Sequence, residues 1–110
     1  LDAFGSETDG TGRGGAVSET AGPLGNPARP SGEWQVYDIV FRAPGFDPSG
    51  KVTKRPTVTV FWNGVLVQDH TEVAGPTRAA IRTEEKPRGP IHLQDHAHPV
   101  KYRNIWVREL

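Results

Sequence analysis

The sequence predicts an all-β fold, an antiparallel β-sandwich or jelly roll, and three observations support this prediction. The 110 residues include 13 Gly and 10 Pro, which favours turns over helices. Several segments alternate apolar and polar residues with the two-residue period of a strand. Long connections rich in turn residues join these segments, as is typical of antiparallel sandwiches.

Composition narrows the possible function classes. Lys plus Arg equals Asp plus Glu at 13 each, without a basic block, which argues against nucleic acid as a partner. The sequence contains no apolar run long enough to span a membrane and no cysteine for disulfide or thiolate chemistry. It also lacks methionine and opens on Leu1 without a signal segment, so we expect a processed chain or a fragment.

The length suits one small domain over residues 1–110, with a loop-rich lead-in at 1–32 and a strand-rich body at 33–110. Residues 5–32 are rich in Gly, Ser, Thr and Pro, and only residues 15–18 could form a short strand there. In residues 33–42, one apolar row consists of Tyr37, Ile39 and Phe41. Ala43-Pro44-Gly45 should end this strand, and residues 46–56 should be a turn-rich excursion.

Residues 57–68 give the clearest local signal, because two β-rich runs flank Asn63-Gly64, a pair typical of the type I′ turn. The predicted register places Trp62 opposite Val65, Phe61 opposite Leu66 and Val60 opposite Val67. We interpret Asn63 as a turn residue and not as a ligand.

Residues 69–90 should form a long connection with one possible helical turn at 77–83. Residues 91–96 then alternate as an extended segment, and residues 102–107 are predicted as a last strand.

A polar cluster at residues 92–98 contains His92, Gln94, Asp95, His96 and His98. On a strand, His92 and His96 would lie roughly 13 Å apart, too far to share one ion without a bend. His96 and His98 could share an ion if Pro99 marks a turn, but the cluster is weak as a metal motif, and we predict no metal. Two interpretations remain open: a solvent-facing row on a half-buried sheet, or a sugar-binding row in which amide, imidazole and aromatic groups contact the ring.

Longer strings add a resemblance. Residues 23–39, PLGNPARPSGEWQVYDI, resemble the "PLxNxxRPPGEWQxYDI" signature of the 3-keto-disaccharide hydrolase family. The strings VTVFWNGVLVQD and GPIHLQDHAHPVKYRNIWVREL resemble its "NGVLV" hairpin and its closing "GPIxLQDHGxPVRFRNIWIRPL" element. The match covers nearly everything from Leu24 onward. It implies a concanavalin-A-like β-sandwich of the lectin/glucanase type, of which this chain is the C-terminal part.

The resemblance also implies an activity, namely cleavage of the glycosidic bond of 3-keto-glycosides by elimination and hydration. The motif positions imply catalytic roles for His96 and Asp95, with His96 as base or acid and Asp95 as the orienting carboxylate. They imply substrate-binding roles for Gln94, Trp34, Asn26 and Arg29. Departures from the pattern occur at Ser18-Glu19, where relatives carry Tyr-Gly, and at His98, where Asn is common.

Partners and location follow as expectations. The ligand should be a carbohydrate, no cofactor is expected, and the missing N-terminal half of the domain or a second chain should cover the open part of the sandwich. A bacterial secreted or periplasmic location would suit this class. Two rival functions remain, a non-catalytic carbohydrate-binding module and a purely structural sandwich, because a fold does not fix an activity.

Overall fold

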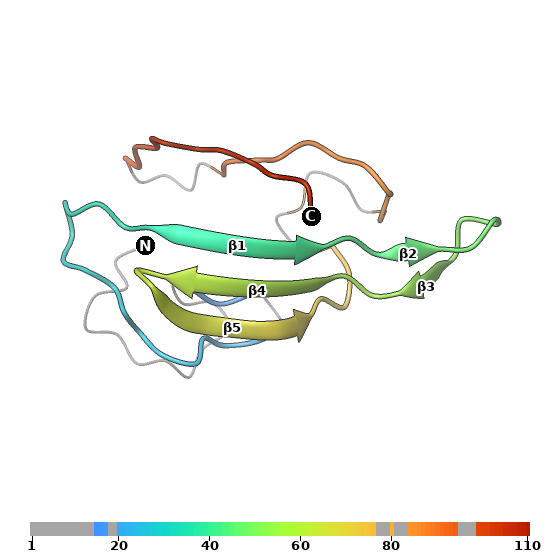
Figure 1. Cartoon of the computed structure of the whole chain (residues 1–110), viewed down its shortest axis with the longest axis horizontal. Coiled ribbons are helices and arrows are strands. Elements are labelled where there is room, and N and C mark those ends of the chain that lie inside the picture. Colours follow the sequence, from blue (N-terminus) through green and yellow to red (C-terminus); the bar gives the residue numbers. More distant parts are fainter. Residues whose placement is uncertain (1–14, 18–19, 77–79, 81–83, 95–98) are drawn as a thin grey trace.

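A computed structural model of the chain describes residues 15–17, 20–76, 80, 84–94 and 99–110. These residues contain five strands and no helix (Figure 1): β1 Tyr37–Arg42, β2 Gly45–Phe46, β3 Val52–Lys54, β4 Thr57–Trp62 and β5 Val65–Glu72. All strand pairs are antiparallel. The prediction of an all-β antiparallel fold is therefore confirmed, and the arrangement is consistent with a partial β-sandwich.

The main sheet has three strands in the order β1-β4-β5. The tip between β4 and β5 is the predicted two-residue turn, in which Asn63 and Gly64 have φ angles of 50° and 80°. The pairs Trp62–Val65 and Phe61–Leu66 match the prediction, whereas Val60 pairs with Gln68. The register shifts twice along β5, by one extra residue between Leu66 and Gln68 and by another between Gln68 and Thr71, and both Val67 and Gln68 are buried at the first shift.

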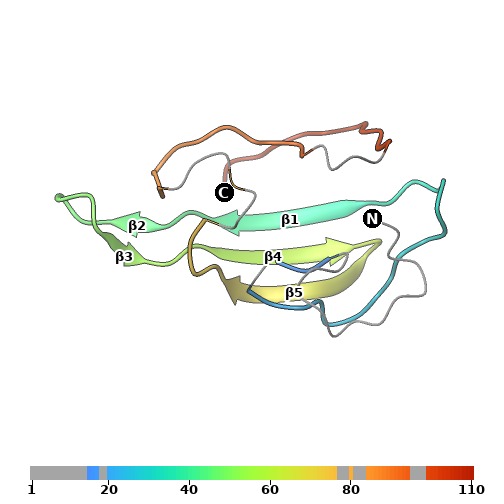
Figure 2. The same cartoon turned by 180° about the vertical axis from the view of Figure 1, so that it is seen from behind.

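Strands β2 and β3 form a short ribbon that continues the β1–β4 pair outward (Figures 1 and 2). The expectation of a purely turn-rich excursion at residues 46–56 was incomplete, because strand pairing continues on both sides of the turn. The Asp47 carboxylate shapes this turn by accepting hydrogen bonds from Ser49 Oγ at 2.6 Å and from the backbone N of Ser49 and Lys51, both at 2.9 Å. These bonds, that of the Ser49 hydroxyl first, lower the pKa of Asp47.

The sheet has two chemically different faces. Residues paired across β1 and β4 share a face, so Tyr37, Ile39, Phe41, Val58, Val60 and Trp62 form what we call the core face. Segment 20–30 crosses this face and bonds β5 through Leu24 N and Val67 O at 2.9 Å. The core is small: Val60, Trp62 and Val67 are buried, with Ala28 and Val58 packed against them.

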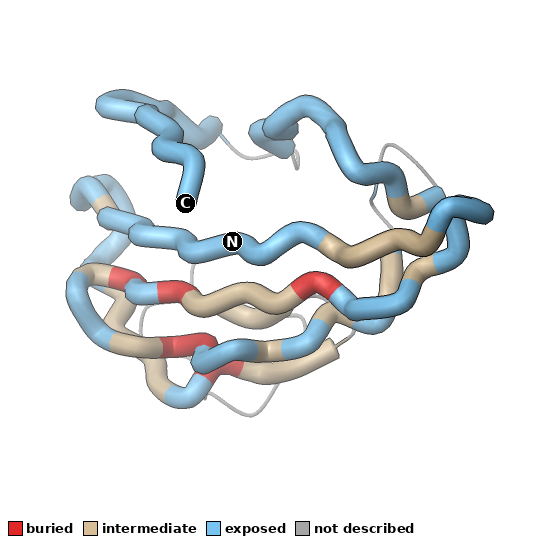
Figure 3. Tube along the Cα trace, turned by 45° about the vertical axis from the view of Figure 1, so that its right-hand side comes forward, coloured by how far each residue is buried: buried red, intermediate tan, exposed pale blue. Residues whose placement is uncertain are grey.

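Strand β1 is exposed along its whole length (Figure 3). Ile39 is 60 % exposed and Phe41 is 54 % exposed, although both belong to the core face. Among the described residues, β1 is also an outer strand that pairs with β4 alone, so no described strand covers its second edge. An open edge beside an exposed apolar row is a surface that proteins normally cover.

The described residues after β5 include a C-terminal limb, residues 84–94 and 99–110, which runs along the β1 side of the sheet (Figures 1 and 3). The predicted strand at 102–107 is wrong, and residues 91–94 are not a strand either. Alternating side chains do not make a strand without a neighbouring backbone, and no described strand pairs with the limb. Residues 77–79 and 81–83 of the predicted helical turn lie outside the described residues.

Two smaller expectations can also be checked. Of the possible strand at 15–18, the described residues 15–17 contain one isolated bridge, between Val17 and Ala21, and Ser18 lies outside the described residues. Within the described part of the chain, the search for a helix capable of crossing a membrane finds none.

Candidate functional site

The signature string folds back on the tip of the β4–β5 hairpin through the side chain of Gln35. Its Oε1 accepts hydrogen bonds from Arg29 N at 3.0 Å, Trp62 Nε1 at 3.2 Å and Asn63 Nδ2 at 2.7 Å. Its Nε2 donates to Arg29 O at 3.1 Å. We call Arg29, Gln35, Trp62 and Asn63 the latch. Because one amide oxygen receives three donors, the latch ties the signature loop to the hairpin.

Asn63 contributes more than its turn conformation. Its Oδ1 accepts from Val36 N at 2.9 Å, and its Nδ2 also donates to Pro27 O at 2.8 Å. Its backbone N donates to Val36 O at 2.8 Å. The prediction that Asn63 is a turn residue is confirmed, and its side chain additionally joins the segments on both sides of the signature loop.

Two predicted substrate-binding residues lie in the same loop. Asn26 Oδ1 accepts from Ala28 N at 3.2 Å, a local turn contact. Arg29 Nη1 donates to Trp34 O at 3.3 Å. These contacts shape the loop that carries Trp34. Sugar contacts by Asn26 and Arg29 stay predictions.

Trp34 and Gln94 each contact one of two neighbouring residues of the limb, Arg103 and Tyr102. The Arg103 guanidinium lies 3.8 Å from the centroid of the Trp34 ring, and Trp34 remains 41 % exposed. The neighbouring Tyr102 hydroxyl donates to Gln94 O at 3.2 Å. We call Trp34, Gln94, Tyr102 and Arg103 the aromatic end. It combines a partly open indole ring, a cation and an amide, which are groups that bind sugars.

The two predicted catalytic residues, Asp95 and His96, lie outside the described residues, as does His98. Gln94, the first residue of the Gln94-Asp95-His96 motif, is described, and its backbone O accepts the hydrogen bond from Tyr102. The catalytic roles of Asp95 and His96 stay predictions.

A second site lies on the opposite face of the sheet, where a groove of about 180 Å³ is lined by Val40, Arg42, Thr57, Thr59 and His70. The pairs Val40–Thr59 and Arg42–Thr57 place four of these side chains on one face of β1 and β4. His70 reaches the groove from β5. We call this the groove face. It combines a cation, an imidazole and two hydroxyls.

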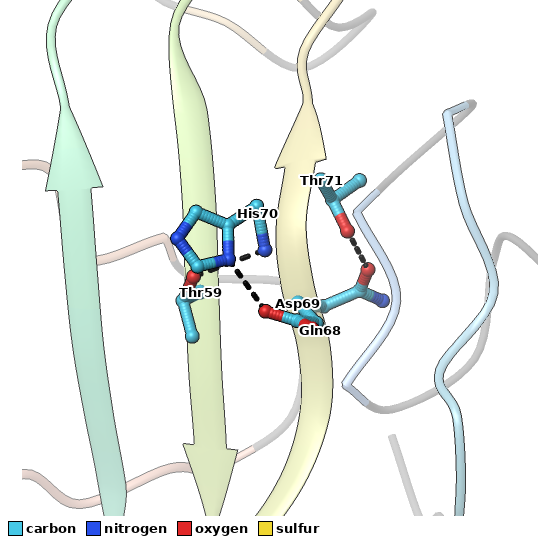
Figure 4. Close-up of polar contacts among 5 residues, drawn as sticks. All are labelled: Thr59, Gln68, Asp69, His70 and Thr71. Atoms are coloured by element: carbon cyan, nitrogen blue, oxygen red, sulfur yellow. Dashed lines mark hydrogen bonds and ion pairs between the residues drawn. The ribbon is translucent and has the colours of Figure 1, made fainter.

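His70 is held in an unusual conformation at the second register shift of β5, between Gln68 and Thr71. Its φ angle is 47°, in the left-handed region that few non-glycine residues adopt. Its backbone N donates to Thr59 Oγ1 at 3.0 Å, and its Nδ1 lies 2.6 Å from Asp69 Oδ1 (Figure 4). Such strain persists only where the surroundings stabilise it, and it often marks functional positions.

The bulge is anchored from the other side by Gln68, which is 2 % exposed. Its Nε2 donates to Gly15 O and Gly22 O, both at 3.0 Å, and its Oε1 accepts from Thr71 Oγ1 at 2.7 Å. Sequence reasoning missed His70. A signal existed, since Gln68-Asp69-His70 repeats the tripeptide Gln94-Asp95-His96.

Comparisons with known proteins agree with the resemblance in the sequence. The model of a family described as a 3-keto-alpha-glucoside-1,2-lyase-like domain matches residues 1–108. A crystal structure of a protein from Parabacteroides distasonis ATCC 8503, assigned as a glycosyl hydrolase, is 39 % identical with a TM-score of 0.67.

The alignment with that structure covers 81 % of this chain and 38 % of the other, so the chain spans well under half of its solved relative. A search of curated proteins finds no match. Because the family match extends over almost all 110 residues, the chain belongs to the 3-keto-alpha-glucoside-1,2-lyase-like family.

Proposed function

We propose that the chain is the C-terminal part of an enzyme that cleaves the glycosidic bond of 3-keto-glycosides. The observation that carries this proposal is the family match over residues 1–108. The solved relative assigned as a glycosyl hydrolase supports the broader class, a glycosyl hydrolase-like carbohydrate-active protein.

The proposed chemistry starts from the acidity that a 3-keto group gives to the C2 proton. A general base removes this proton, and the electron pair moves to the C3 oxygen as an enolate. The enolate then re-forms the ketone as the C1–O bond breaks, and the leaving oxygen takes a proton. Water adds across the resulting C1–C2 double bond. We assign the base to His96 and its orientation to Asp95.

Substrate positioning is assigned to the aromatic end. The Trp34 ring carries Arg103 at 3.8 Å from its centroid and keeps 41 % of its surface exposed, which leaves area for the C–H face of a sugar. We assign the side-chain amide of Gln94 to contacts with sugar hydroxyls. Asn26 and Arg29 support the loop that presents Trp34.

A second candidate function is a carbohydrate-binding module without catalysis. The observation that favours it is the set of exposed aromatic side chains near the limb, since Trp106 is 75 % exposed and Tyr102 is 50 % exposed. Open aromatic rings bind sugars by stacking and need no base.

Substitutions in the intact enzyme test both functions, with turnover of a 3-keto-glucoside measured between about pH 5 and 9. His96→Ala should abolish turnover while the circular dichroism spectrum stays unchanged. Gln94→Ala should mainly raise KM, and Asp95→Ala should lower both activity and stability. The matched control His92→Ala should retain turnover.

Undiminished turnover in His96→Ala would refute the assignment of the base. Sugar binding without turnover in the wild type would favour the binding module. Loss of wild-type turnover on addition of a chelator would show that a metal takes part.

A further inference from the structure

The groove on the sheet face contains a guanidinium, that of Arg42. Arg42 is the one permanently charged residue among the five that line it. Within the described part of the chain, no residue forms an ion pair or side-chain hydrogen bond with the Arg42 guanidinium. Two carboxylates of β5 have other partners, Asp69 with His70 at 2.6 Å and Glu72 with Arg55 at 3.6 Å.

His70 is presented to the groove in a fixed orientation. With the Asp69 carboxylate ionised, Nδ1–H donates to it, so Nε2 is the ring atom left for a ligand. The His70 side chain is 73 % exposed. Figure 4 shows its ring on the β4 side, near Thr59, whereas the Gln68 amide points the opposite way. A ligand would therefore meet an imidazole that needs little reorganisation.

The lining selects a ligand class. A guanidinium binds a carboxylate through two parallel hydrogen bonds. The hydroxyls of Thr57 and Thr59 both donate and accept, which suits sugar hydroxyls. Val40 offers apolar surface for C–H groups. The volume of about 180 Å³ is below the roughly 300–1,000 Å³ of drug-sized pockets and suits a single ring.

We propose that this groove is a binding subsite for one sugar-acid ring, a pyranose that carries a carboxylate. Arg42 binds the carboxylate, and His70 and the threonine hydroxyls bind ring hydroxyls. The proposal rests on the proposed carbohydrate function and adds a subsite apart from the aromatic end. Trp34 precedes β1 while Arg42 ends it, so about 20 Å of strand separates the two places.

The test is a nuclear magnetic resonance titration of the intact protein with isotopically labelled histidine. The probe is glucuronate, with glucose as the ring without a carboxylate and acetate as the carboxylate without a ring. Glucuronate should shift the His70 ring signals saturably. The signals that are absent in His70→Asn identify the His70 ring, and Asn is the chosen replacement because it tolerates a positive φ. Arg42→Gln should weaken glucuronate binding about tenfold or more. The matched control Arg108→Gln, at an exposed position of the limb, should not.

Three results would overturn the proposal. Equal affinity for glucose and glucuronate would show that the carboxylate is not recognised. Equal affinity for acetate and glucuronate would show that the ring is not recognised. Unchanged His70 signals would remove the site itself. Calorimetric titration of His70→Asn gives a second measurement if Arg42→Gln fails to fold.

The two proposals can fail separately. In His96→Ala, turnover should be lost while glucuronate still shifts the His70 signals. If His96→Ala retains turnover and glucuronate still shifts the His70 signals, the assignment of the base fails and the subsite stands.

Discussion

Substitution of Asn63 tests whether the latch stabilises the fold. The Asn63 side chain forms three hydrogen bonds, with Val36 N, Pro27 O and Gln35 Oε1, at 2.9, 2.8 and 2.7 Å. Each bond contributes about 0.5–1.5 kcal/mol net, with the lower values where water can replace the partner. Because the site is only partly buried, we expect Asn63→Gly to cost about 2 kcal/mol.

Asn63→Ala should cost more than Asn63→Gly. The φ angle of 50° is left-handed, and alanine there is strained by roughly 1 kcal/mol more than glycine. We therefore expect a total of about 3 kcal/mol for Asn63→Ala. The difference between the two variants isolates the backbone contribution.

Urea unfolding followed by tryptophan fluorescence gives the measurement. Trp62 is a suitable reporter, since it is 3 % exposed and stacks on Tyr37 with ring centroids 5.3 Å apart. With a urea slope of about 1–2 kcal/mol per molar, a loss of about 2 kcal/mol lowers the midpoint by about 1–2 M. An unchanged midpoint and slope in Asn63→Gly would refute the reasoning, because the three bonds would then contribute nothing.

Four further outcomes are expected. Gly64→Val should lower the free energy of unfolding by roughly 1–3 kcal/mol through its φ of 80° alone, since nothing lies within 4 Å of an added Cβ. Gly64→Asn should lower it much less, and equal losses for the two variants in urea unfolding would contradict this. Burial raises the pKa of Tyr37 to about 12, so the folded state keeps its proton longer and stability should fall between about pH 10 and 12. This fall in stability should be on the order of 1 kcal/mol, because Tyr37 is 46 % exposed and solvent screens the phenolate charge. Urea midpoints measured across this pH range should show the fall in the wild type and not in Tyr37→Phe. Gln68→Leu should cost about 2–3 kcal/mol in chemical unfolding, because two carbonyls lose their donor; a loss under about 0.5 kcal/mol would mean that water replaces the amide. Finally, the chain should pair through the open edge of β1 with a second chain or a second copy of itself. Sedimentation velocity should show concentration-dependent association that Ile39→Lys reduces, and a monomer at every concentration would argue against this pairing.

The hairpin was predictable because its cause is local. Asn63-Gly64 determines the turn, and the turn determines the first two pairs of the register. The prediction failed at Val60 because the bulge depends on distant partners. Gln68 is drawn inward by carbonyls of residues 15 and 22, far away in the sequence. Periodicity within β5 contains no information about those carbonyls.

The two candidate sites also differ in how far the sequence could reveal them. Trp34 and Gln94 were recognised from motif strings, and in the structure they contact the neighbouring limb residues Arg103 and Tyr102, respectively. The motif could not show that Arg29 contacts backbone, since a residue that supports a loop and one that binds a ligand look alike in sequence. The groove face escaped notice because β1, β4 and β5 each contribute to it.

The latch also affects how fast the folded state is lost. The bonds from Gln35 to Trp62 and Asn63 join residues 27 and 28 positions apart, and the bond from Asn63 to Pro27 spans 36 positions. The β4–β5 hairpin, in contrast, closes over a two-residue turn. Contacts between distant residues form only after the chain has lost the entropy of loop closure. We therefore expect the latch to form late, after the folding transition state. Interactions absent from that state slow unfolding without changing the folding rate. The lifetime of the native chain against proteases and heat would then depend on a few hydrogen bonds at the hairpin tip.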